Sequence, residues 1–201
     1  MPSERQEIQL VWLKRDLRTE DHAALVAAEA SGMPWLALWI FEPSLLAHPD
    51  AAPRHHGFCL QSIAALNRRW QGIRQEVAVF YAEAEEVFSA LDAMYKIVAV
   101  HSYAESGTRI TWDRDRRMQR WFQAKGICWT EYQRDGIQRG IRNREGWDAA
   151  WFATMHAPLI ANSYRQAAPL PLPTTLLLQD AQRDAWLRAT EGMQPGGEQL
   201  A

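Results

Sequence analysis

The stretch IQLVWLKRDLRTEDHAALVAAEASGMPWLALWIF, residues 8–41, decides the fold. Ile8–Leu13 is a short apolar run typical of a strand, and Trp35–Phe41 is a continuous apolar run typical of a strand buried on both faces. The alanine-rich residues 22–30 between them predict a helix that Asp21 caps. Two strands joined by a helix predict a right-handed crossover within a parallel sheet.

The same alternation of helices and strands continues along the chain. We expect helices over Arg54–Gln71, Ala84–Met94 and Thr108–Lys125. Each of them is followed by an expected strand, over Val77–Tyr81, Ile97–Val100 and Ile127–Tyr132. This pattern predicts an α/β fold: a Rossmann-like, doubly wound five-stranded parallel sheet with helices on both faces, followed by an extended linker. With the strands numbered along the chain, the expected order across the sheet is 3-2-1-4-5, and such folds bind ligands at the carboxyl ends of the strands.

We expect the chain to divide into three parts. Residues 1–133 form the α/β domain, residues 134–166 a helical extension that packs on it, and residues 167–201 an interdomain linker. The extension carries a helix over Trp147–Met155, and the linker contains four prolines and three glycines around a short helix over Asp180–Thr190. This composition predicts that the chain is a piece of a longer protein, or a natural short form of one.

The overall composition excludes several classes of protein. With 201 residues, a net charge of -2, 47% hydrophobic and 23% charged residues, the chain is typical of a globular protein rather than a disordered one. It lacks the run of ~20 apolar residues that a membrane helix needs, and the polar Met1–Glu7 is not a secretory signal. The two cysteines, Cys59 and Cys128, form no C-x-x-C pair. We therefore expect a cytoplasmic protein that binds neither a membrane nor a metal.

The charge is unevenly distributed. Arg109–Arg144 carries a net charge of +6, and the rest of the chain carries -8. A basic segment of this kind forms a solvated helix surface, a contact with an acidic partner or a nucleic-acid face, and the sequence leaves these three open. The chain contains no G-x-G-x-x-G, no P-loop and no G-x-S-x-G motif, so the residues alone predict no self-contained catalytic site.

A dense cluster of charges follows the first strand. The segment Trp12–Leu25 reads WLKRDLRTEDHAAL, which places Lys14, Arg15, Asp16 and Arg18 at the carboxyl end of that strand. A doubly wound fold binds its ligand or partner at this position. The plainer interpretation of at least one of these residues is a buried Arg–Asp pair that holds the loop.

This segment resembles the opening of the DNA photolyase/cryptochrome family, whose pattern is W-[FL]-[RK]-R-D-L-R-x-x-D-[NH]-x-A-L. Other parts of the chain also resemble this family: Ile40–Pro43, the helix that begins at Arg54, Arg114 and Asp115 followed by Trp121, and Pro195–Glu198. The segments 101–107 and 136–147 are most similar to a bacterial branch of the family. The resemblance covers nearly the whole chain.

The resemblance implies that this chain is the N-terminal light-harvesting domain of a flavoprotein. In the family this domain binds an antenna chromophore, which is a folate, a deazaflavin or a flavin. The catalytic FAD belongs to a C-terminal helical domain that also docks damaged DNA, so the isolated chain is expected to be inactive. The expected partners are that FAD-binding domain and, for the full-length protein, damaged DNA.

The family resemblance leaves more than one function open. The full-length protein would repair pyrimidine dimers by light-driven electron transfer, as a DNA photolyase, or would act as a cryptochrome-type blue-light photoreceptor. A function of another class is a stand-alone α/β nucleotide-binding or interaction protein. That class predicts a phosphate-binding glycine loop, which the sequence lacks.

The family's antenna pockets use strand ends that this sequence also contains. The corresponding candidates for chromophore binding are Trp39, Phe41, Glu42, Arg54, His55, Phe58, His101, Tyr103, Glu105 and Thr108. Aromatic faces would stack on a flat ligand, Arg54 would bind an anionic group, and Glu42 or Glu105 would accept from ring N–H groups. The plainer alternative for the aromatic candidates is a place in the core. Residues expected in structural or interdomain roles are Arg15, Asp16, Arg18, Arg114 and Asp115.

The ten tryptophans are unusually many for a chain of this length. Six lie on predicted strands or apolar helix stripes and are expected in the core: Trp12, Trp35, Trp39, Trp70, Trp121 and Trp129. We expect that some of the other four, Trp112, Trp147, Trp151 and Trp186, form a surface on which the helical domain rests.

Overall fold

The five strands form one parallel sheet, as the sequence predicts. In the computed structural model, which describes residues 5–133, 136 and 142–191, the strand order is β3-β2-β1-β4-β5. The strands are β1 Glu7–Leu13, β2 Trp35–Phe41, β3 Val77–Tyr81, β4 Lys96–Tyr103 and β5 Cys128–Tyr132. All four pairs of neighbouring strands are parallel, so their carboxyl ends share one edge of the sheet.

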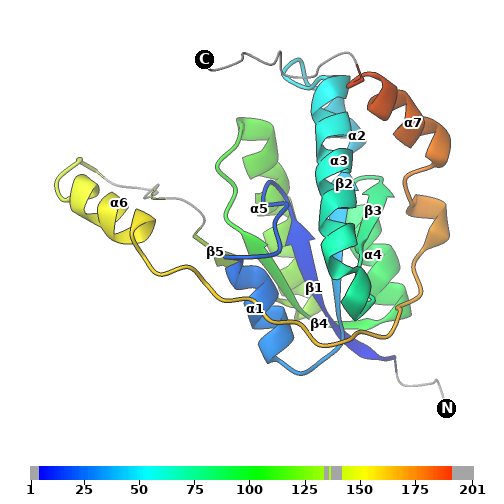
Figure 1. Ribbon diagram of the computed structural model, residues 1–201, viewed down its shortest axis with the longest axis horizontal. Coiled ribbons are helices and arrows are strands. Elements are labelled where there is room, and N and C mark those ends of the chain that lie inside the picture. Colours follow the sequence, from blue (N-terminus) through cyan, green and yellow to red (C-terminus); the bar gives the residue numbers. More distant parts are fainter. Residues whose placement is uncertain (1–4, 134–135, 137–141, 192–201) are drawn as a thin grey trace, which may run out of the picture.

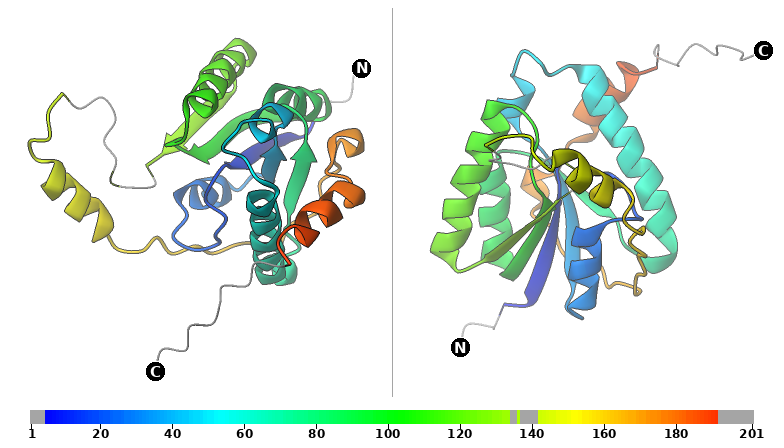
Figure 2. Two further views of the ribbon diagram at one scale, coloured as in Figure 1. Left: turned by 90° about the horizontal axis from the view of Figure 1, so that it is seen from above. Right: turned by 90° about the vertical axis from the view of Figure 1, so that its left-hand side faces the viewer.

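Helices cover both faces of the sheet (Figures 1 and 2). On one face, α1 (Ala23–Ala30) and α3 (Pro53–Trp70) bury an apolar cluster with residues of β1 and β2. On the other face, α4 (Ala84–Met94) and α5 (Arg109–Lys125) bury a second apolar cluster. This cluster contains the residues of β1 and β2 whose side chains point away from the first cluster. Because successive side chains of a strand point to opposite faces, only a strand that is apolar throughout can serve both clusters. β2 is such a strand, and all seven of its residues are buried.

Two local features differ from the sequence-based expectations. The residue that caps α1 is His22, whose Nδ1 accepts a hydrogen bond from the backbone N–H of Leu25 at 3.2 Å. Asp21 instead takes a left-handed backbone conformation (φ 52°), and its carboxylate accepts from the N–H of Ile160. A short helix, α2 (Pro43–Leu46), follows β2 in a segment for which the sequence predicted no helix. Pro43 explains it, because the fixed φ of proline suits the first position of a helix.

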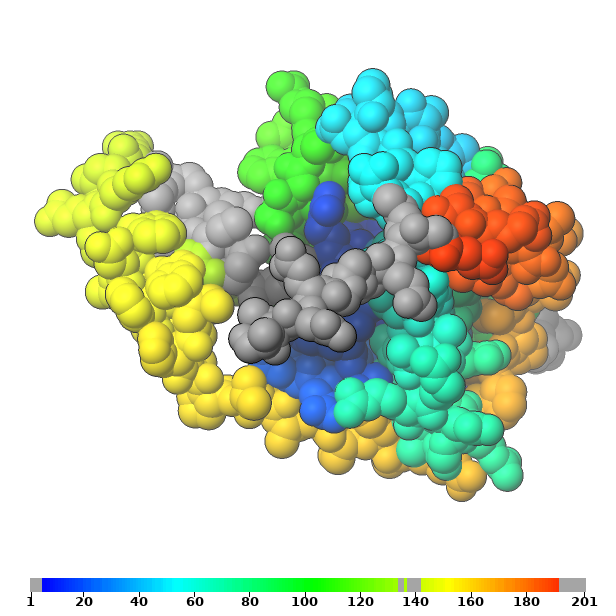
Figure 3. Space-filling view, turned by 45° about the horizontal axis from the view of Figure 1, so that its top comes forward, coloured from blue at the N-terminus to red at the C-terminus, as the bar shows by residue number. Residues whose placement is uncertain are grey.

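The segment after β5 leaves the sheet and then returns to it. Helix α6 (Trp147–Met155) buries none of its residues and stands apart from the sheet in Figures 1 and 3. The chain then passes along α1, where Asn162 exchanges hydrogen bonds with the backbone of His22 and Arg165 pairs with Glu29. Tyr164 packs on Trp70 of α3, with ring centroids 5.6 Å apart.

The described part of the predicted linker, residues 167–191, also packs against the domain, whereas Pro195–Glu198 lies outside the described residues. Its extended residues place Leu170, Leu172, Leu176 and Leu177 against the core, and the backbone N–H of Leu178 donates to the carbonyl of Val79 on the edge strand β3. Helix α7 (Asp180–Arg188) then packs along α3, and Figure 3 shows the two side by side. Trp186 of α7 is only 7% exposed, which corrects the expectation of a surface role for this tryptophan.

Of the other tryptophans, Trp12, Trp35, Trp39 and Trp70 are buried, and Trp121 and Trp129 are partly buried against the core. Within the part of the chain that the structure describes, no helix combines the length and the apolar character needed to cross a membrane.

Candidate functional site

A cavity of about 680 Å³ opens at the carboxyl ends of β1 and β2. Its walls come from the residues that follow these two strands, from α2, from the first turns of α3 and from the start of α5 with the loop before it. This volume lies within the ~300–1,000 Å³ that small-molecule sites commonly have. The position is the crevice outside the carboxyl ends of the strands, beside the point between β1 and β4 where the order of the strands across the sheet reverses.

The cavity brings together seven of the ten candidate binding residues. They are Trp39, Phe41, Glu42, His55, Phe58, Glu105 and Thr108. Phe58 is 67% exposed, which is unusual for so large an apolar side chain. Phe58 is therefore not a core residue, which was the alternative to a binding role for the aromatic candidates. Trp39 and Phe41 contribute both to the core and to the cavity wall.

The other three candidates do not line the cavity. Arg54 is exposed, and it precedes His55 in the first turn of α3, where adjacent residues point about 100° apart. Nε2 of His101 lies 2.7 Å from Gln9 Oε1, and its Nδ1 lies 3.1 Å from the Tyr132 hydroxyl. The Tyr103 hydroxyl accepts a hydrogen bond from the backbone N–H of Ala23. The contacts of His101 and Tyr103 are thus made within the fold, and neither side chain lines this cavity.

A buried network of ion pairs forms the inner wall of the cavity. Its centre is Arg114, 5% exposed, whose Nη1 lies 2.5 Å from Glu42 Oε1 and whose Nη2 lies 3.3 Å from Glu105 Oε2. Its Nε donates to Asp115 at 2.8 Å. Arg15 approaches from the loop after β1, with its Nε 2.8 Å from Glu105 Oε1. The guanidinium group of Arg114 therefore connects three carboxylates from three separate segments.

These contacts determine the ionisation of the two cavity carboxylates. Burial raises the pKa of Glu42 above its usual value, against the attraction of Arg114. Burial would also raise the pKa of Glu105, but the hydrogen bond and charge of Arg15, with the charge of Arg114, lower it overall. Glu42 and Glu105 thus both accept hydrogen bonds from arginine side chains.

Lys14 extends the same network to the other side of β1. Its Nζ lies 2.8 Å from Asp115 Oδ2 and 3.2 Å from Glu131 Oε1, and the side chain is 3% exposed. The side chains of Lys14 and Arg114 also approach the ring of Trp12, at 5.3 and 4.7 Å from its centroid. A cation over an indole face is attracted by the ring quadrupole. Arg114 and Asp115, for which we expected structural or interdomain roles, both make ion pairs within this network.

Asp16 has a structural contact of its own. Its Oδ2 lies 2.6 Å from Nε2 of His22, and both side chains are essentially buried. Because Nδ1 of His22 accepts from the Leu25 N–H, the proton between the two side chains lies on Nε2. Burial would raise the pKa of Asp16, but the contact with His22 and the backbone N–H groups of Arg15 and Lys14 lower it overall. The dyad anchors the loop after β1 to the cap of α1.

Replacing Asp16 with Asn should change how stability depends on pH. A carboxyl with a lowered pKa stabilises the fold fully above its unfolded value of about 3.9, and this contribution is lost as the pH falls through the folded value. We expect Asp16→Asn to cost about 1.5–3 kcal/mol at pH 7 and progressively less below pH 4. Urea unfolding between pH 3 and 7 measures this, with the exposed Asp50→Asn as control. An equal cost at all pH values would contradict the expected ionisation.

Apolar and aromatic side chains form much of the remaining wall, together with polar ones such as His48, Asp50 and Ser62, and two buried nitrogens of its lining residues are unsatisfied. Nε1 of Trp39 and Nδ1 of His56 have no hydrogen-bond partner among the described residues. Burial lowers the pKa of His56, so its ring is neutral near pH 7, and burial raises the pKa of the nearby Cys59 thiol to about 11. A buried N–H without an acceptor costs about 1–3 kcal/mol. A flat ligand fits such a wall, because it can stack on the aromatic rings.

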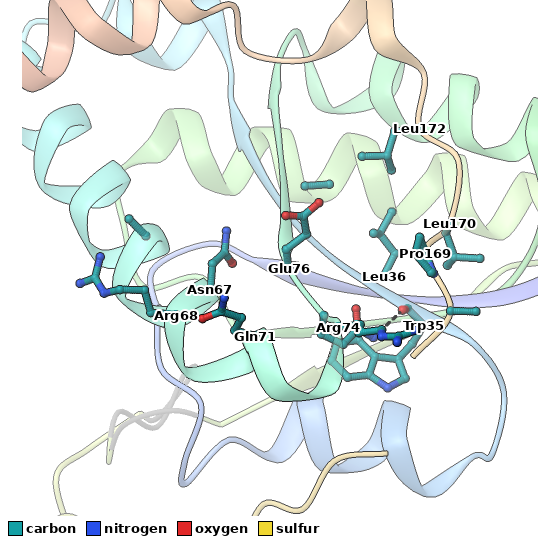
Figure 4. A pocket seen from close by; sticks show the side chains of 14 residues that line it. Trp35, Leu36, Asn67, Arg68, Gln71, Arg74, Glu76, Pro169, Leu170 and Leu172 are labelled. Carbon is teal, nitrogen blue, oxygen red and sulfur yellow. Dashed lines mark hydrogen bonds between the residues drawn. The ribbon is translucent and has the colours of Figure 1, made fainter. Parts of the chain in front are cut away.

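A second cavity, of about 630 Å³, lies at the opposite edge of the sheet (Figure 4). It lies between the end of α3, the starts of β2 and β3, and residues 168–172. Two of its amide side chains form hydrogen bonds with the backbone. Asn67 accepts from the N–H of Val77, and Gln75 donates to the carbonyl of Trp35. This cavity lacks the unsatisfied buried nitrogens of the first. Among the described residues, no group of three or more His, Cys, Asp or Glu side chains is placed so that it could hold a metal ion.

Sequence reasoning missed Lys14 and His56 as parts of this site. The strand-end position of Lys14 was a usable signal, but its burial depends on Asp115 and Glu131, which come from distant segments. His56 was not among the candidate residues, although it lines the cavity together with the candidate His55.

The comparisons with known proteins agree with this fold. Residues 9–137 match the family model described as DNA photolyase. The chain is 32% identical over 139 residues to a deoxyribodipyrimidine photo-lyase of Halobacterium salinarum, which covers 62% of this chain and 27% of that protein. It is also 32% identical over 101 residues to a cryptochrome DASH of Gloeobacter violaceus, covering 48% of this chain and 20% of that protein.

Solved structures show the same fold at lower identity. An archaeal photolyase from Sulfolobus tokodaii, described as holding two FAD molecules, superposes with a TM-score of 0.66 at 18% identity, over 90% of this chain and 41% of its own. A Synechocystis cryptochrome superposes with a TM-score of 0.68 at 20% identity, over 88% of this chain and 41% of its own. The chain spans less than half the length of each of these relatives. Because the family model matches more than half of the chain, the chain belongs to the DNA photolyase family, with the fold of the N-terminal α/β domain of photolyases and cryptochromes.

Proposed function

We propose that this chain is a light-harvesting domain that binds a flat conjugated chromophore in the cavity at the carboxyl ends of β1 and β2. The observation that carries the proposal is the wall of this cavity, which is aromatic and leaves the nitrogens of Trp39 and His56 unsatisfied. The candidate chromophores are a folate, a deazaflavin and a flavin. When bound, such a group absorbs light and passes the excitation to a catalytic flavin.

The residues of the cavity have separate tasks in this proposal. Phe58 and Trp39 offer ring faces for stacking, and the N–H of Trp39 donates to a carbonyl or ring nitrogen of the ligand. Arg15 is half exposed at the cavity, and its Nε is held by Glu105, which directs the guanidinium toward an anionic substituent of the ligand. In this proposal Arg15 binds the anionic group of the ligand, a role that we first expected for Arg54.

Titration of the purified chain with flavin mononucleotide, a 5-deazaflavin and a reduced folate tests the proposal. We expect one of them to bind with a change in fluorescence, and Phe58→Ala to weaken that binding by about tenfold, because loss of base or ring stacking costs on the order of 1–3 kcal/mol. The control is Phe152→Ala on α6, which removes a phenylalanine that is similarly exposed (55%) but distant from the cavity. Equal binding by the two variants would exclude the cavity, and no binding of any of the three probes would exclude the function.

The activity of the whole protein is a further step of the same proposal. The sequence relatives carry both names, photo-lyase and cryptochrome DASH, and each is much longer than this chain. We propose that the domain acts beside a C-terminal FAD-binding domain and that the full-length protein repairs pyrimidine dimers in DNA. A blue-light photoreceptor is the alternative. Loss of dimers from ultraviolet-damaged DNA under blue light, measured on the full-length protein, separates the two.

A further inference from the structure

Helix α7 lies directly behind the chromophore cavity. The ring of Trp186 has its centroid 4.7 Å from that of Phe41 and 4.9 Å from that of His56. Phe41 and His56 line the cavity, whereas Trp186 does not. Trp186 is therefore in a second layer, and it is buried among the residues of the core cluster that also contains Trp39. Figure 1 shows α7 beside α3, which carries His56.

The close approach of the two helices depends on Gly57. A Cβ atom at this position would lie 2.3 Å from Cγ2 of Thr190 and 2.5 Å from the carbonyl oxygen of Trp186. The end of α7 is also held by a hydrogen bond of 3.0 Å from Gln61 Nε2 to Thr190 Oγ1. Any larger residue at position 57 would thus push α7, and Trp186 with it, away from α3.

We propose that Trp186 is a positioning residue of the chromophore cavity, and that docking of α7 and binding of the chromophore therefore favour each other. This inference rests on the proposed function. Phe41 and His56 keep their positions because the indole of Trp186 fills the space behind them. Without it they gain room to move away from the ligand, since a core that loses a large side chain relaxes only partly. Coupling between two events is reciprocal, so the ligand must stabilise α7 as much as α7 stabilises the ligand.

The first test compares chromophore affinities among variants. Using whichever of flavin mononucleotide, the 5-deazaflavin and the reduced folate binds the wild-type chain, we expect Trp186→Ala to weaken binding by about tenfold, within the range of coupling between linked sites. Trp186→Phe should restore most of the affinity, since its ring still fills the space. Gly57→Ala should also weaken binding, although it changes no residue that lines the cavity. Trp147→Ala on α6 is the control and should bind as the wild type does.

Two further measurements separate positioning from a general loss of stability. Well below the unfolding temperature, the absorption band of the bound chromophore should shift in Trp186→Ala and return in Trp186→Phe. In the wild type, the chromophore should slow trypsin cleavage after Arg183 and Arg188 of α7 more than cleavage after Arg116 of α5.

The outcomes distinguish the inference from the proposed function. Unchanged affinity and absorption band in folded Trp186→Ala and Gly57→Ala would overturn the inference and leave the proposed function intact. If Trp186→Ala does not fold, Trp186→Phe, Gly57→Ala and the trypsin measurement decide the question alone. If none of the three probes binds the wild-type chain, the proposed function fails and the inference fails with it.

Discussion

Replacing Arg114 with Met should destabilise the domain more than any other single change to its charged residues. Arg114 is buried and holds Glu42, Glu105 and Asp115. Removing one partner from a buried ion pair commonly costs about 3–5 kcal/mol, because the remaining charge has no compensation. We expect a loss in this range in the free energy of unfolding, measured by urea denaturation at pH 7.

Two comparisons decide whether the buried charges cause this loss. Arg116→Met, on the same helix but with a side chain 64% exposed, should leave the free energy of unfolding unchanged within error. Combining Arg114→Met with Glu42→Gln and Glu105→Gln should recover part of the loss, because two of the uncompensated charges are then absent. A loss below about 1 kcal/mol for Arg114→Met would mean that water solvates these carboxylates well.

Replacing Trp70 with Ala should have the second large effect. Trp70 is 2% exposed, and its ring lies 5.7 Å from that of Trp35 and 5.6 Å from that of Tyr164. Truncating a buried tryptophan leaves a cavity and commonly costs about 3–5 kcal/mol. We expect a destabilisation of this size by urea denaturation, and also faster proteolysis near Tyr164, because the returning segment loses the ring on which it rests.

Trp70→Phe and Trp147→Ala are the matched variants. The first keeps an aromatic ring in the space and should cost clearly less than Trp70→Ala. The second removes an indole from α6, a helix with no buried residue, and should cost little. Equal costs for Trp70→Ala and Trp147→Ala would show that the segment after β5 does not pack as the structure has it.

Much of the sheet was predictable because its signals are local. A strand buried on both faces must be apolar throughout, so Trp35–Phe41 could be identified without knowledge of its neighbours. The end of α5 was equally readable, since Gly126 takes a left-handed conformation there (φ 69°). The cap of α1 was not, because aspartate is a commoner cap than histidine, and yet His22 caps the helix in the structure. The pairing of His22 with buried Asp16 is a tertiary contact.

Hydrophobic periodicity and a short motif are carried by neighbouring residues, so the doubly wound sheet, most of its helices and the family could be identified from the chain alone. Which candidates share the cavity depends on how distant segments pack together. In the structure His55 lines the cavity and Arg54 does not. His101 and Tyr103 make their hydrogen bonds within the fold, and Trp186 lies behind the cavity wall. The physical reason is that the cavity is built from separate segments of the chain. Burial and charge pairing at such a junction depend on how these segments pack, which no local pattern specifies.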